Sequence, residues 1–383
     1  MNITLKESSE VLSAHANVAA GSALEKNNSA PYDIVVSDSF PDAKVLWKSL
    51  QMHGLLSPFQ DYEWVKSWLD SFSGANRPEP ILVHLYKGKR LVGLLPLCKT
   101  RSFGSTIISW MADSVSDTCV PLLLHNELEK LSQEAIQTIL DRVAMELSNV
   151  DLYLLRYQPI SFDGIENPFA KVNQQIVSGE SHQVGIEQPW LPFYQTLRSS
   201  KTRSRLRQKW RKLSKRGHLS FRSVRDPADQ KDALDQILSW KSDQLNQRGS
   251  RNPFFTGGGH PSRLTQTLQS YLNHDAQTDS GSLRIFGLFL NGELIAGYAT
   301  FVEPKRFSVF VNAYAPDSHS DCSPGLLLLV RLLELSSRSG RDVLDLMRGA
   351  EDYKKDWCSD CTLLVNNLYP ITWRGRLYGK AHR

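Results

Sequence analysis

The sequence predicts a mixed α/β protein made of two related domains, each with a mostly antiparallel sheet flanked by helices. Two observations indicate this class. First, a length of 383 residues exceeds what a single core usually serves, so we expect two domains. Second, the pattern of residues 81–97 recurs at residues 284–301: an apolar strand, a turn, and a second apolar strand that carries a glycine.

The first half of the chain contains one copy of an element order. A helical pattern over residues 61–72 precedes the hairpin at residues 81–97. After the hairpin and a further strand candidate, apolar residues recur at helical spacing over residues 129–148. An apolar run at residues 150–157 then predicts a closing strand.

The second half repeats this order. We expect a helix, a hairpin, a strand, a helix and a closing strand at residues 229–247, 284–301, 307–314, 323–340 and 342–349. Asn291-Gly292 is typical of a tight hairpin turn, because both residue types accept positive φ angles.

The composition of the segments sets the expected domain boundaries. Residues 1–32 are rich in Ala, Ser and Asn and are expected to form a disordered tail. We expect the first domain at residues 33–180 and the second at residues 190–383. Residues 159–189 contain Pro, Gly, Asn and Ser without periodicity, which indicates a connector.

Several classes of protein do not fit the sequence. The longest apolar runs fall far short of the roughly 18 residues of a membrane-spanning helix, and the N-terminus does not resemble a secretory signal. The five cysteines are odd in number and scattered, which fits a reducing, cytoplasmic location. Cys358 and Cys361 have metal-ligand spacing, but no second pair of ligands follows, so we expect no metal site.

A leucine-rich helix opens on Ser323-Pro324-Gly325. A serine can cap the first N–H groups, and proline suits the first helical position. Glycine leaves the helix start bare, so that an anion can reach the unpaired donors and the positive end of the dipole. The same three residues also fit the plain start of a buried helix, and the motif alone leaves both interpretations open.

Residues 190–357 resemble the GNAT superfamily of N-acyltransferases, and within it the CelD-type family of cellulose-biosynthesis acetyltransferase-like proteins. The resemblance lies in the order of hairpin, strand, open helix and strand, and in three motifs. These are a W-x-x-x-Y-x-x-L pattern at Trp190, Tyr194 and Leu197; the segment AYAPDSHSDCSPGLLLL; and a D-x-x-R-G-x-E-x-Y-K pattern from Asp345 to Lys354. Both halves are therefore expected to be GNAT-like, with the first half degenerate because it lacks the last two motifs.

The resemblance implies direct transfer of an acetyl or other acyl group from acyl-coenzyme A to an amine or hydroxyl, without a covalent intermediate. In such folds the strand before the key helix pairs with the pantetheine arm, and the helix start holds the pyrophosphate. The residues that match these cofactor positions are Val311, Asn312, Tyr314, Ser323, Gly325 and Leu326. The usual pyrophosphate motif has a basic or Gln residue and two glycines, whereas this chain has only Ser-Pro-Gly. An envelope or polysaccharide acceptor is a further implication.

The stretch after the closing strand carries our candidate catalytic residues, Glu351, Tyr353 and Lys354. Acyl transfer to an amine needs a base, a polarised carbonyl and an acid for the leaving thiolate, and a carboxylate and a tyrosine can serve. The alternative is an exposed Glu351–Lys354 pair with a core tyrosine. Further candidates for substrate binding are Asp317, Arg348, Arg203 and Arg207.

Residues 198–217 carry ten Lys or Arg and no acid. Leu206, Trp210 and Leu213 form one apolar stripe on this helix, so one face is expected to pack and the rest to stay charged. The charge suits coenzyme A phosphates, an anionic substrate or nucleic acid. The sequence thus leaves two rivals to a small-molecule acyltransferase: a Fem-like transferase or RNA-binding module that takes aminoacyl-tRNA or RNA, and a non-catalytic scaffold.

Overall fold

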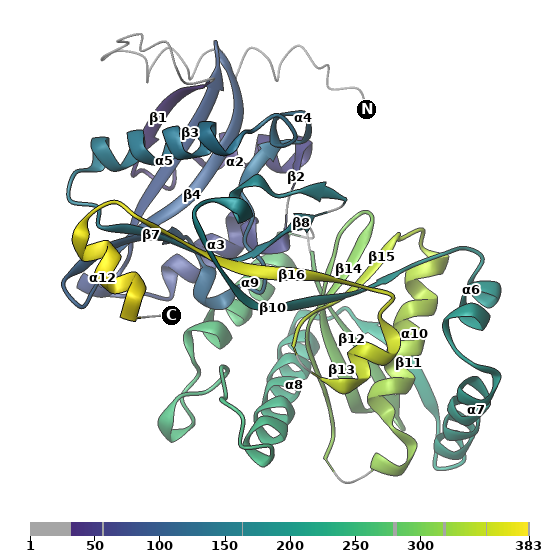
Figure 1. Ribbon diagram of the computed structural model, residues 1–383. Helices are drawn as coiled ribbons and strands as arrows, with labels where there is room; N and C mark the ends of the chain where they lie inside the picture. Colours follow the sequence, from purple (N-terminus) through teal and green to yellow (C-terminus); the bar gives the residue numbers. More distant parts are fainter. Residues whose placement is uncertain are drawn as a thin grey trace. The chain divides into compact units, whose positions relative to one another are not determined.

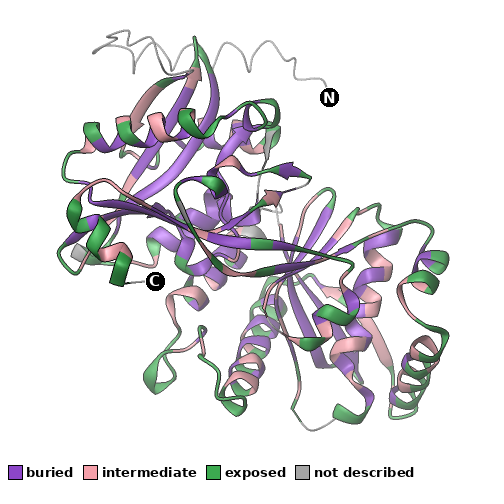
Figure 2. Cartoon of the chain, in the orientation of Figure 1, coloured by how far each residue is buried: buried purple, intermediate pink, exposed green. Residues whose placement is uncertain are grey.

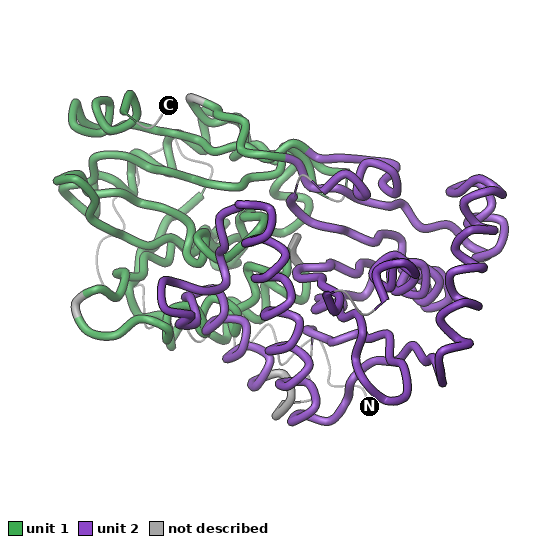
Figure 3. Tube along the Cα trace, turned by 90° about the horizontal axis from the view of Figure 1, so that it is seen from below, with its two compact units in different colours: residues 1–179, 363–383 green, residues 180–362 purple. Residues whose placement is uncertain are grey.

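The computed structural model describes residues 32–55, 57–162, 164–278, 282–316, 319–349 and 351–381 (Figure 1). The tail expected at residues 1–32 lies outside the described residues, except for Tyr32. The chain forms two compact units (Figure 3): unit 1 is Met1–Gly179 with Leu363–Arg383, and unit 2 is Glu180–Thr362.

The path of the chain between the units differs in one respect from the boundaries expected from sequence. The chain leaves unit 1 after Gly179, next to the expected end of the first domain. It returns to unit 1 at Leu363, so residues 363–383 belong with the first half and not with the second. The reason is a long-range strand pairing, in which Leu364–Pro370 form an antiparallel ladder with Leu152–Pro159.

Unit 1 contains a sheet with the strand order β1-β3-β4-β5-β7-β16. Its strands are β1 (Asp33–Ser37), β2 (Gly54–Leu55), β3 (Glu79–Lys87), β4 (Arg90–Ser102), β5 (Ser105–Trp110), β6 (Leu122–Leu124), β7 (Leu152–Pro159), β8 (Ser161–Phe162), β9 (Ile165–Glu166) and, from Leu363 on, β16 (Asp360–Pro370). Its helices are α2 (Lys44–His53), α3 (Tyr62–Asp70), α4 (His125–Leu128), α5 (Gln133–Leu147) and α12 (Trp373–Ala381), with the 3-10 turns η1 (Pro58–Gln60), η2 (Gly74–Asn76), η3 (Asp113–Val115) and η4 (Pro168–Lys171).

The hairpin expected in the first half is formed by β3 and β4, which pair up to Lys87 and Arg90. Gly93 of β4 is needed because a Cβ there would lie 2.2 Å from the side chain of Leu123 in β6. Strands β5 and β7 pair in parallel, and α5 lies between them in the chain, as the right-handed crossover of such a pair requires.

Unit 2 contains a sheet with the strand order β10-β15-β14-β13-β12-β11. Its strands are β10 (Gln174–Gly185, from Glu180 on), β11 (Leu219–Val224), β12 (Leu283–Leu290), β13 (Glu293–Val302), β14 (Arg306–Tyr314) and β15 (Val343–Arg348). Its helices are α6 (Trp190–Leu197), α7 (Ser200–Ser214), α8 (Pro227–Gln247), α9 (Arg263–Thr278), α10 (Pro324–Arg338) and α11 (Asp352–Trp357), with the 3-10 turns η5 (Gly257–Gly259) and η6 (Ser320–Cys322).

The hairpin of unit 2 closes where the sequence predicts it. Leu290 pairs with Glu293, and the turn residues Asn291 and Gly292 have φ angles of 53° and 89°. Strand β14 pairs with β13 in antiparallel and with β15 in parallel direction. In each unit the described ladders are antiparallel apart from one parallel pair, which confirms the predicted fold class.

Helices α8 and α10 cover opposite faces of the sheet of unit 2. Successive strand residues point to opposite faces. A Cβ on Gly297 of β13 would lie 2.4 Å from Ile237 of α8, whereas the hydroxyl of the next residue, Tyr298, donates to the carbonyl of Gly325 in α10. Most of α10 that faces the sheet is buried (Figure 2): Leu327, Leu328, Leu329, Leu332 and Leu333 are buried, and Leu326 and Leu335 are partly buried.

The connector expected at residues 159–189 is more ordered than predicted. It contains β8, β9, the turn η4 and the long strand β10. Alternation of polar and apolar residues is weak in β10, so its pairing partners, and not its own pattern, specify the strand. Within the described residues, no helix is both long enough and apolar enough to cross a membrane.

Candidate active site

The site lies at the carboxyl ends of the parallel strands β14 and β15. Their ladder covers Arg306–Ser308 and Val343–Asp345 and ends there. Asp345 fixes this end: its buried carboxylate accepts from the guanidinium of Arg306 at 3.0 Å and from the hydroxyl of Ser181 at 3.0 Å. The aspartate that opens the D-x-x-R-G motif therefore ties β10, β14 and β15 together.

A charge cluster follows the end of β15. The carboxylate of Glu351 lies 3.1 Å from the ammonium of Lys241 and 3.0 Å from that of Lys354. The Lys354 side chain is only 3% exposed, and its Nζ also donates to the carbonyls of Met347 and Arg348. The exposed ion pair considered from sequence is thus excluded, since these charges are buried and bonded on several sides.

The two lysines determine the protonation of Glu351. Burial by itself raises the pKa of a carboxyl group, but the ammonium groups of Lys354 and Lys241 outweigh it and lower the pKa of Glu351 to about 2. Such a carboxylate is a weak proton acceptor at neutral pH. The geometry therefore favours Glu351 as the charge partner of two lysines over Glu351 as the base.

Lys241 completes the cluster from helix α8 and was not identified from sequence. Burial lowers the pKa of Lys241, and the Glu351 carboxylate offsets part of that effect. A signal was present: the buried residues Leu234 and Leu238 place Lys241 at the next position of the apolar stripe of α8. A lysine in that stripe needs a buried partner, which lies 110 residues away in sequence.

Asn312 of β14 connects the cluster to Tyr353. Its side-chain oxygen accepts from Lys241 at 3.2 Å, and its side-chain nitrogen donates to the hydroxyl of Tyr353 at 2.5 Å. Because that hydroxyl accepts here, its own proton remains to be donated elsewhere. Burial raises the pKa of Tyr353, with the Glu351 charge adding to the effect, so the phenol stays protonated. The available proton suits a donor, whereas the raised pKa makes the phenol a weaker acid than an exposed tyrosine.

Gly349 makes room for the ion pair. Its φ is 147°, and a Cβ there would lie 2.2 Å from Glu351 Oε2 and 2.6 Å from Lys354 Nζ. Met347, two residues earlier, also has a positive φ of 57°, held by a hydrogen bond from its N–H to Asp345. These irregular residues turn the chain so that Glu351 and Lys354 face back to the strand end.

The start of α10 differs from the prediction in one respect. Ser323 was expected to cap the helix, but its backbone is left-handed (φ 51°, ψ 60°) and its side chain caps no N–H group. That expectation is wrong, because this backbone turns the hydroxyl away from the helix, where it accepts from Lys209 at 2.6 Å. Helix α7 thereby places an ammonium group at the N-terminus of α10.

Gly325 accommodates a neighbouring ring. A Cβ at this position would lie 3.2 Å from the ring of Tyr314, the last residue of β14, so a side chain here would require a small shift of that ring. Tyr298 bonds to the carbonyl of Gly325 at 2.9 Å, and its pKa is raised by burial, Tyr353 and Glu351. The helix start and the charge cluster are therefore neighbours.

The remaining predicted residues are spread more widely. Val311 is buried in β14, and the N–H of Leu326 already donates to the carbonyl of Ser323. Arg348 ends β15, where its carbonyl accepts from Lys354.

The two arginines predicted on α7 lie elsewhere. The guanidinium groups of Arg203 and Arg207 act on Tyr194 of α6, whose pKa is raised by burial and partly lowered again by these charges. Asp317 lies outside the described residues. Within the described part of the chain, no three His, Cys, Asp or Glu residues are grouped to hold a metal ion.

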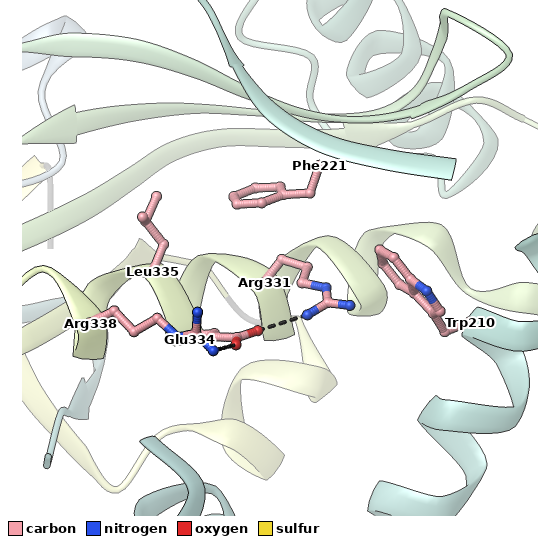
Figure 4. A pocket seen from close by; sticks show the side chains of 6 residues that line it. All are labelled: Trp210, Phe221, Arg331, Glu334, Leu335 and Arg338. Atoms are coloured by element: carbon pink, nitrogen blue, oxygen red, sulfur yellow. Dashed lines mark hydrogen bonds and ion pairs between the residues drawn. The ribbon is translucent and has the colours of Figure 1, made fainter. Parts of the chain in front are cut away.

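The apolar stripe of the basic helix packs as predicted. Leu206 and Leu213 are buried, and Trp210 stacks under the guanidinium of Arg331 at 4.1 Å. Trp210 also lines a hollow of about 310 Å³ together with Phe221 and the outer face of α10 (Figure 4). Arg331 and Arg338 both pair with Glu334 there, which leaves the lining of this hollow with one net positive charge.

The family model of the acetyltransferase (GNAT) domain matches residues 200–355, which lie in unit 2. This match confirms the predicted GNAT acetyltransferase domain, whereas the narrower likeness to CelD-type proteins stays a prediction. No curated protein sequence matches this chain.

Three solved structures share the fold at low sequence identity. FemX has a TM-score of 0.60 and 10% identity, covering 92% of this chain and 100% of that chain. A C-terminal domain assigned to lysylphosphatidylglycerol synthetase from Agrobacterium fabrum has a TM-score of 0.51 and 12% identity, covering 90% and 95%. A conserved protein of unknown function from Bacteroides thetaiotaomicron has a TM-score of 0.50 and 11% identity, covering 89% and 100%.

Proposed function

We propose that unit 2 transfers an acetyl or other acyl group from acyl-coenzyme A to an amine or hydroxyl acceptor. One observation carries the proposal: Tyr298 bonds to the uncapped start of α10, which Lys209 supplies with charge, and is the register partner of Asn312, which bonds to Lys241 and Tyr353 of the cluster. An anion site and a group of proton-handling side chains are thus neighbours, as a thioester of a phosphorylated carrier requires.

The start of α10 supplies the groups for a diphosphate. The N–H groups of Leu326 and Leu327 already bond to the carbonyl of Ser323, so Gly325 offers the first amide of the helix. The Lys209 ammonium adds a full positive charge to the helix dipole. We infer that the pantetheine arm follows β14 beyond Ser308, where the ladder with β15 ends, past Val311, Asn312 and Tyr314.

The cluster supplies the groups for acyl transfer. The acceptor nitrogen forms a bond to the thioester carbonyl carbon and loses a proton, and the carbon–sulfur bond breaks. Tyr353, whose hydroxyl accepts from Asn312, gives its phenolic proton to the leaving thiolate, and the proton that the acceptor nitrogen releases returns to the phenolate, so the protons balance. Lys354 and Lys241 favour negative charge on the carbonyl oxygen as it develops, and Glu351 holds the two ammonium groups in place.

The acceptor and its setting are the finer part of the proposal. We place the reaction in the cytoplasm, which the odd number of cysteines supports, and in polysaccharide or envelope biosynthesis. Arg348 at the end of β15 is proposed to bind an anionic acceptor, whereas Arg203 and Arg207 of α7, which lie near Tyr194, stay predictions for acceptor binding. Asp317 remains a prediction for acceptor binding.

A second candidate is a Fem-like transfer of an aminoacyl group from tRNA. Two observations favour it: the likeness in fold to FemX over 92% of the chain, and the acid-free helix α7. An ester-linked aminoacyl group needs the same cluster for its chemistry, but its carrier is a long polyanion that would extend over α7.

Binding measurements on the full chain separate these functions. Thermal-shift assays with acetyl-, succinyl- and long-chain acyl-coenzyme A should show stabilisation by one of them, which calorimetry then quantifies. Filter binding of aminoacylated tRNA at rising salt tests the second candidate. Stabilisation by tRNA alone would replace acyl-coenzyme A as the donor. Absence of binding by both carriers would leave the scaffold interpretation and overturn the proposal.

A further inference from the structure

Unit 1 carries an exposed apolar patch that the proposed reaction does not use. We define the patch as Phe103, Trp373 and Leu377, whose residues are 89%, 65% and 56% exposed. Phe103 occupies the turn between β4 and β5, and the other two lie on α12 (Figure 1). Large exposed aromatic groups gathered in one place are uncommon on a soluble surface and mark interaction sites.

The turn holds the Phe103 ring outward. Ser102 pairs with Ser105, so Phe103 and Gly104 are the two turn residues, with φ angles of 48° and 76°. A left-handed backbone suits Asn or Gly, and it is unfavourable for a bulky aromatic residue. The sequence thus retains phenylalanine at a position where a smaller residue would favour folding, and it leaves most of the ring in solvent.

Helix α12 is fixed with its apolar outer side toward solvent. A Cβ on Gly375 would lie 2.0 Å from the carbonyl oxygen of Asp151, so this helix rests directly on the backbone of the sheet edge. The N–H groups of Ile371 and Thr372 donate to the same carbonyl at 2.8 and 3.1 Å. Trp373 and Leu377, four residues apart, occupy the opposite side.

The turn and the helix enclose a shallow groove. Its volume is about 820 Å³, and its lining includes the whole patch with Ser105, Arg374, Tyr378 and Ala381. The groove lies within unit 1, because all of these residues belong to that unit. Its size is sufficient for part of an acyl chain or for the packing of several rings at a lipid boundary.

Positive charges surround the patch. Arg374, Arg376 and Lys380 of α12 are exposed, as is Arg101 before the turn. Residues 370–381 contain no Asp or Glu. Apolar and aromatic side chains on one side of a helix with basic residues beside them are typical of segments that lie in the headgroup region of a membrane.

We propose that this face of unit 1 binds the surface of an anionic lipid bilayer. Phe103, Trp373 and Leu377 enter the boundary between headgroups and acyl chains, and the four basic residues contact lipid phosphates. Charge complementarity selects this occupant: residues 370–381 carry basic side chains and no acid, and anionic bilayer surfaces combine apolar depth with negative charge. The proposal concerns unit 1 and does not depend on the reaction proposed for unit 2.

Co-sedimentation of the full chain with unilamellar vesicles tests the proposal. We expect binding to vesicles of phosphatidylglycerol and phosphatidylcholine at low salt, and weak binding to phosphatidylcholine alone. The double variant Phe103→Ser/Trp373→Ser should reduce the partition coefficient about tenfold, since it removes the two largest apolar groups. Arg374→Glu/Lys380→Glu should reduce it to a similar extent of about tenfold at low salt.

Matched variants control for general effects. Met145→Ser on α5 removes a side chain that is 73% exposed elsewhere in unit 1, and Lys89→Glu reverses an exposed charge in the β3–β4 turn. Both should bind vesicles as the unchanged chain does, and thermal melts check that every variant folds. Absence of vesicle binding at low salt would overturn the proposal. An equal loss of vesicle binding with Lys89→Glu would also overturn it. So would a chain that does not bind vesicles but forms a dimer in sedimentation velocity, if the Phe103→Ser/Trp373→Ser variant dissociates that dimer.

Discussion

The crossover helices α5 of unit 1 and α10 of unit 2 occupy corresponding places but begin differently. In α5 the hydroxyl of Ser132 caps the N–H of Ala135 at 3.1 Å, and Glu134 places a negative charge in the first turn. In α10 Ser323 caps nothing, the first turn has no acid, and Lys209 adds a positive charge. The helix start of unit 1 is closed to anions, whereas that of unit 2 is electrostatically prepared for one.

The charged residues at the strand ends also differ between the two units. Near the end of β7, buried Asp113 forms a single ion pair with Arg156 at 2.9 Å. At the end of β15, one carboxylate lies between two ammonium groups, and the net charge of the cluster is positive. The comparison shows that the two units keep the same element order with different charges at their strand ends, and under our proposal these charges decide which unit binds the cofactor.

Replacing one buried tyrosine in each unit should show the largest difference between the proposed roles of the two units. Tyr353→Phe removes the proposed proton donor and should lower turnover by about 100-fold to 10,000-fold, with acyl-coenzyme A binding preserved. Tyr153→Phe in unit 1 removes only a hydrogen bond to the carbonyl of Leu140 and should cost about 1 kcal/mol of stability. Steady-state kinetics and thermal melts separate these outcomes. Full turnover in Tyr353→Phe would reject its role as acid.

Neutralising one buried carboxylate in each unit tests the charge cluster. Glu351→Gln leaves two buried ammonium groups without their counterion and should reduce the free energy of unfolding by about 3–5 kcal/mol. Asp113→Asn leaves the half-exposed Arg156, and burial already favours a neutral group at this position, so the variant should cost less, under about 1 kcal/mol. Chemical denaturation measures both. A smaller loss for Glu351→Gln than for Asp113→Asn would argue against a tightly coupled cluster.

Adding a negative charge to the first turn of α5 and of α10 tests the electrostatic difference between the two helix starts. Gly325→Glu should weaken acyl-coenzyme A binding about 100-fold, the value of roughly two charge-assisted hydrogen bonds. Lys209→Ala tests the same site without crowding Tyr314, and should weaken binding about tenfold. Gln133→Glu at the exposed start of α5 is the control and should leave affinity unchanged. Calorimetry gives the affinities, and unaltered binding in both unit 2 variants would remove the diphosphate site.

Lowering the pH should have opposite effects on the stability that Glu351 and Asp113 contribute. The pKa of Glu351 is lowered from 4.5 to about 2, so its contribution to stability is present above about pH 4.5 and declines as the pH falls toward 2. From pH 4.5 to 3.5 the loss should be about 1 kcal/mol. Burial raises the pKa of Asp113, against the charge of Arg156, so its protonation in acid favours the fold. Comparing the unchanged chain with Glu351→Gln by calorimetry isolates the first effect.

Local patterns predicted the elements and part of the site. The hairpins, α5, α8 and α10 follow from turn residues and apolar periodicity, which are read over a few neighbouring positions. Glu351 and Lys354 were found because they stand three residues apart in one motif. Lys241 was missed, since its partner lies far away in sequence.

Other features are set by contacts that no local pattern specifies. The left-handed backbone of Ser323 depends on the turn η6 and on Lys209 of another helix, so the expected cap was wrong. Residues 363–383 return to unit 1 through pairing with β7, which the order of elements along the chain does not indicate. Sequence periodicity indicates which face of a helix or strand is buried. Tertiary pairing determines which other element covers that face.

The return of residues 363–383 to unit 1 makes unit 2 an insertion within unit 1. During synthesis the first 179 residues leave the ribosome without the strand that completes their sheet, and that strand arrives only after all of unit 2. Unit 2 therefore has its full complement of residues earlier than unit 1, although it begins later. Removal of residues 363–383 would therefore take a strand from unit 1 and leave the residues of unit 2 complete.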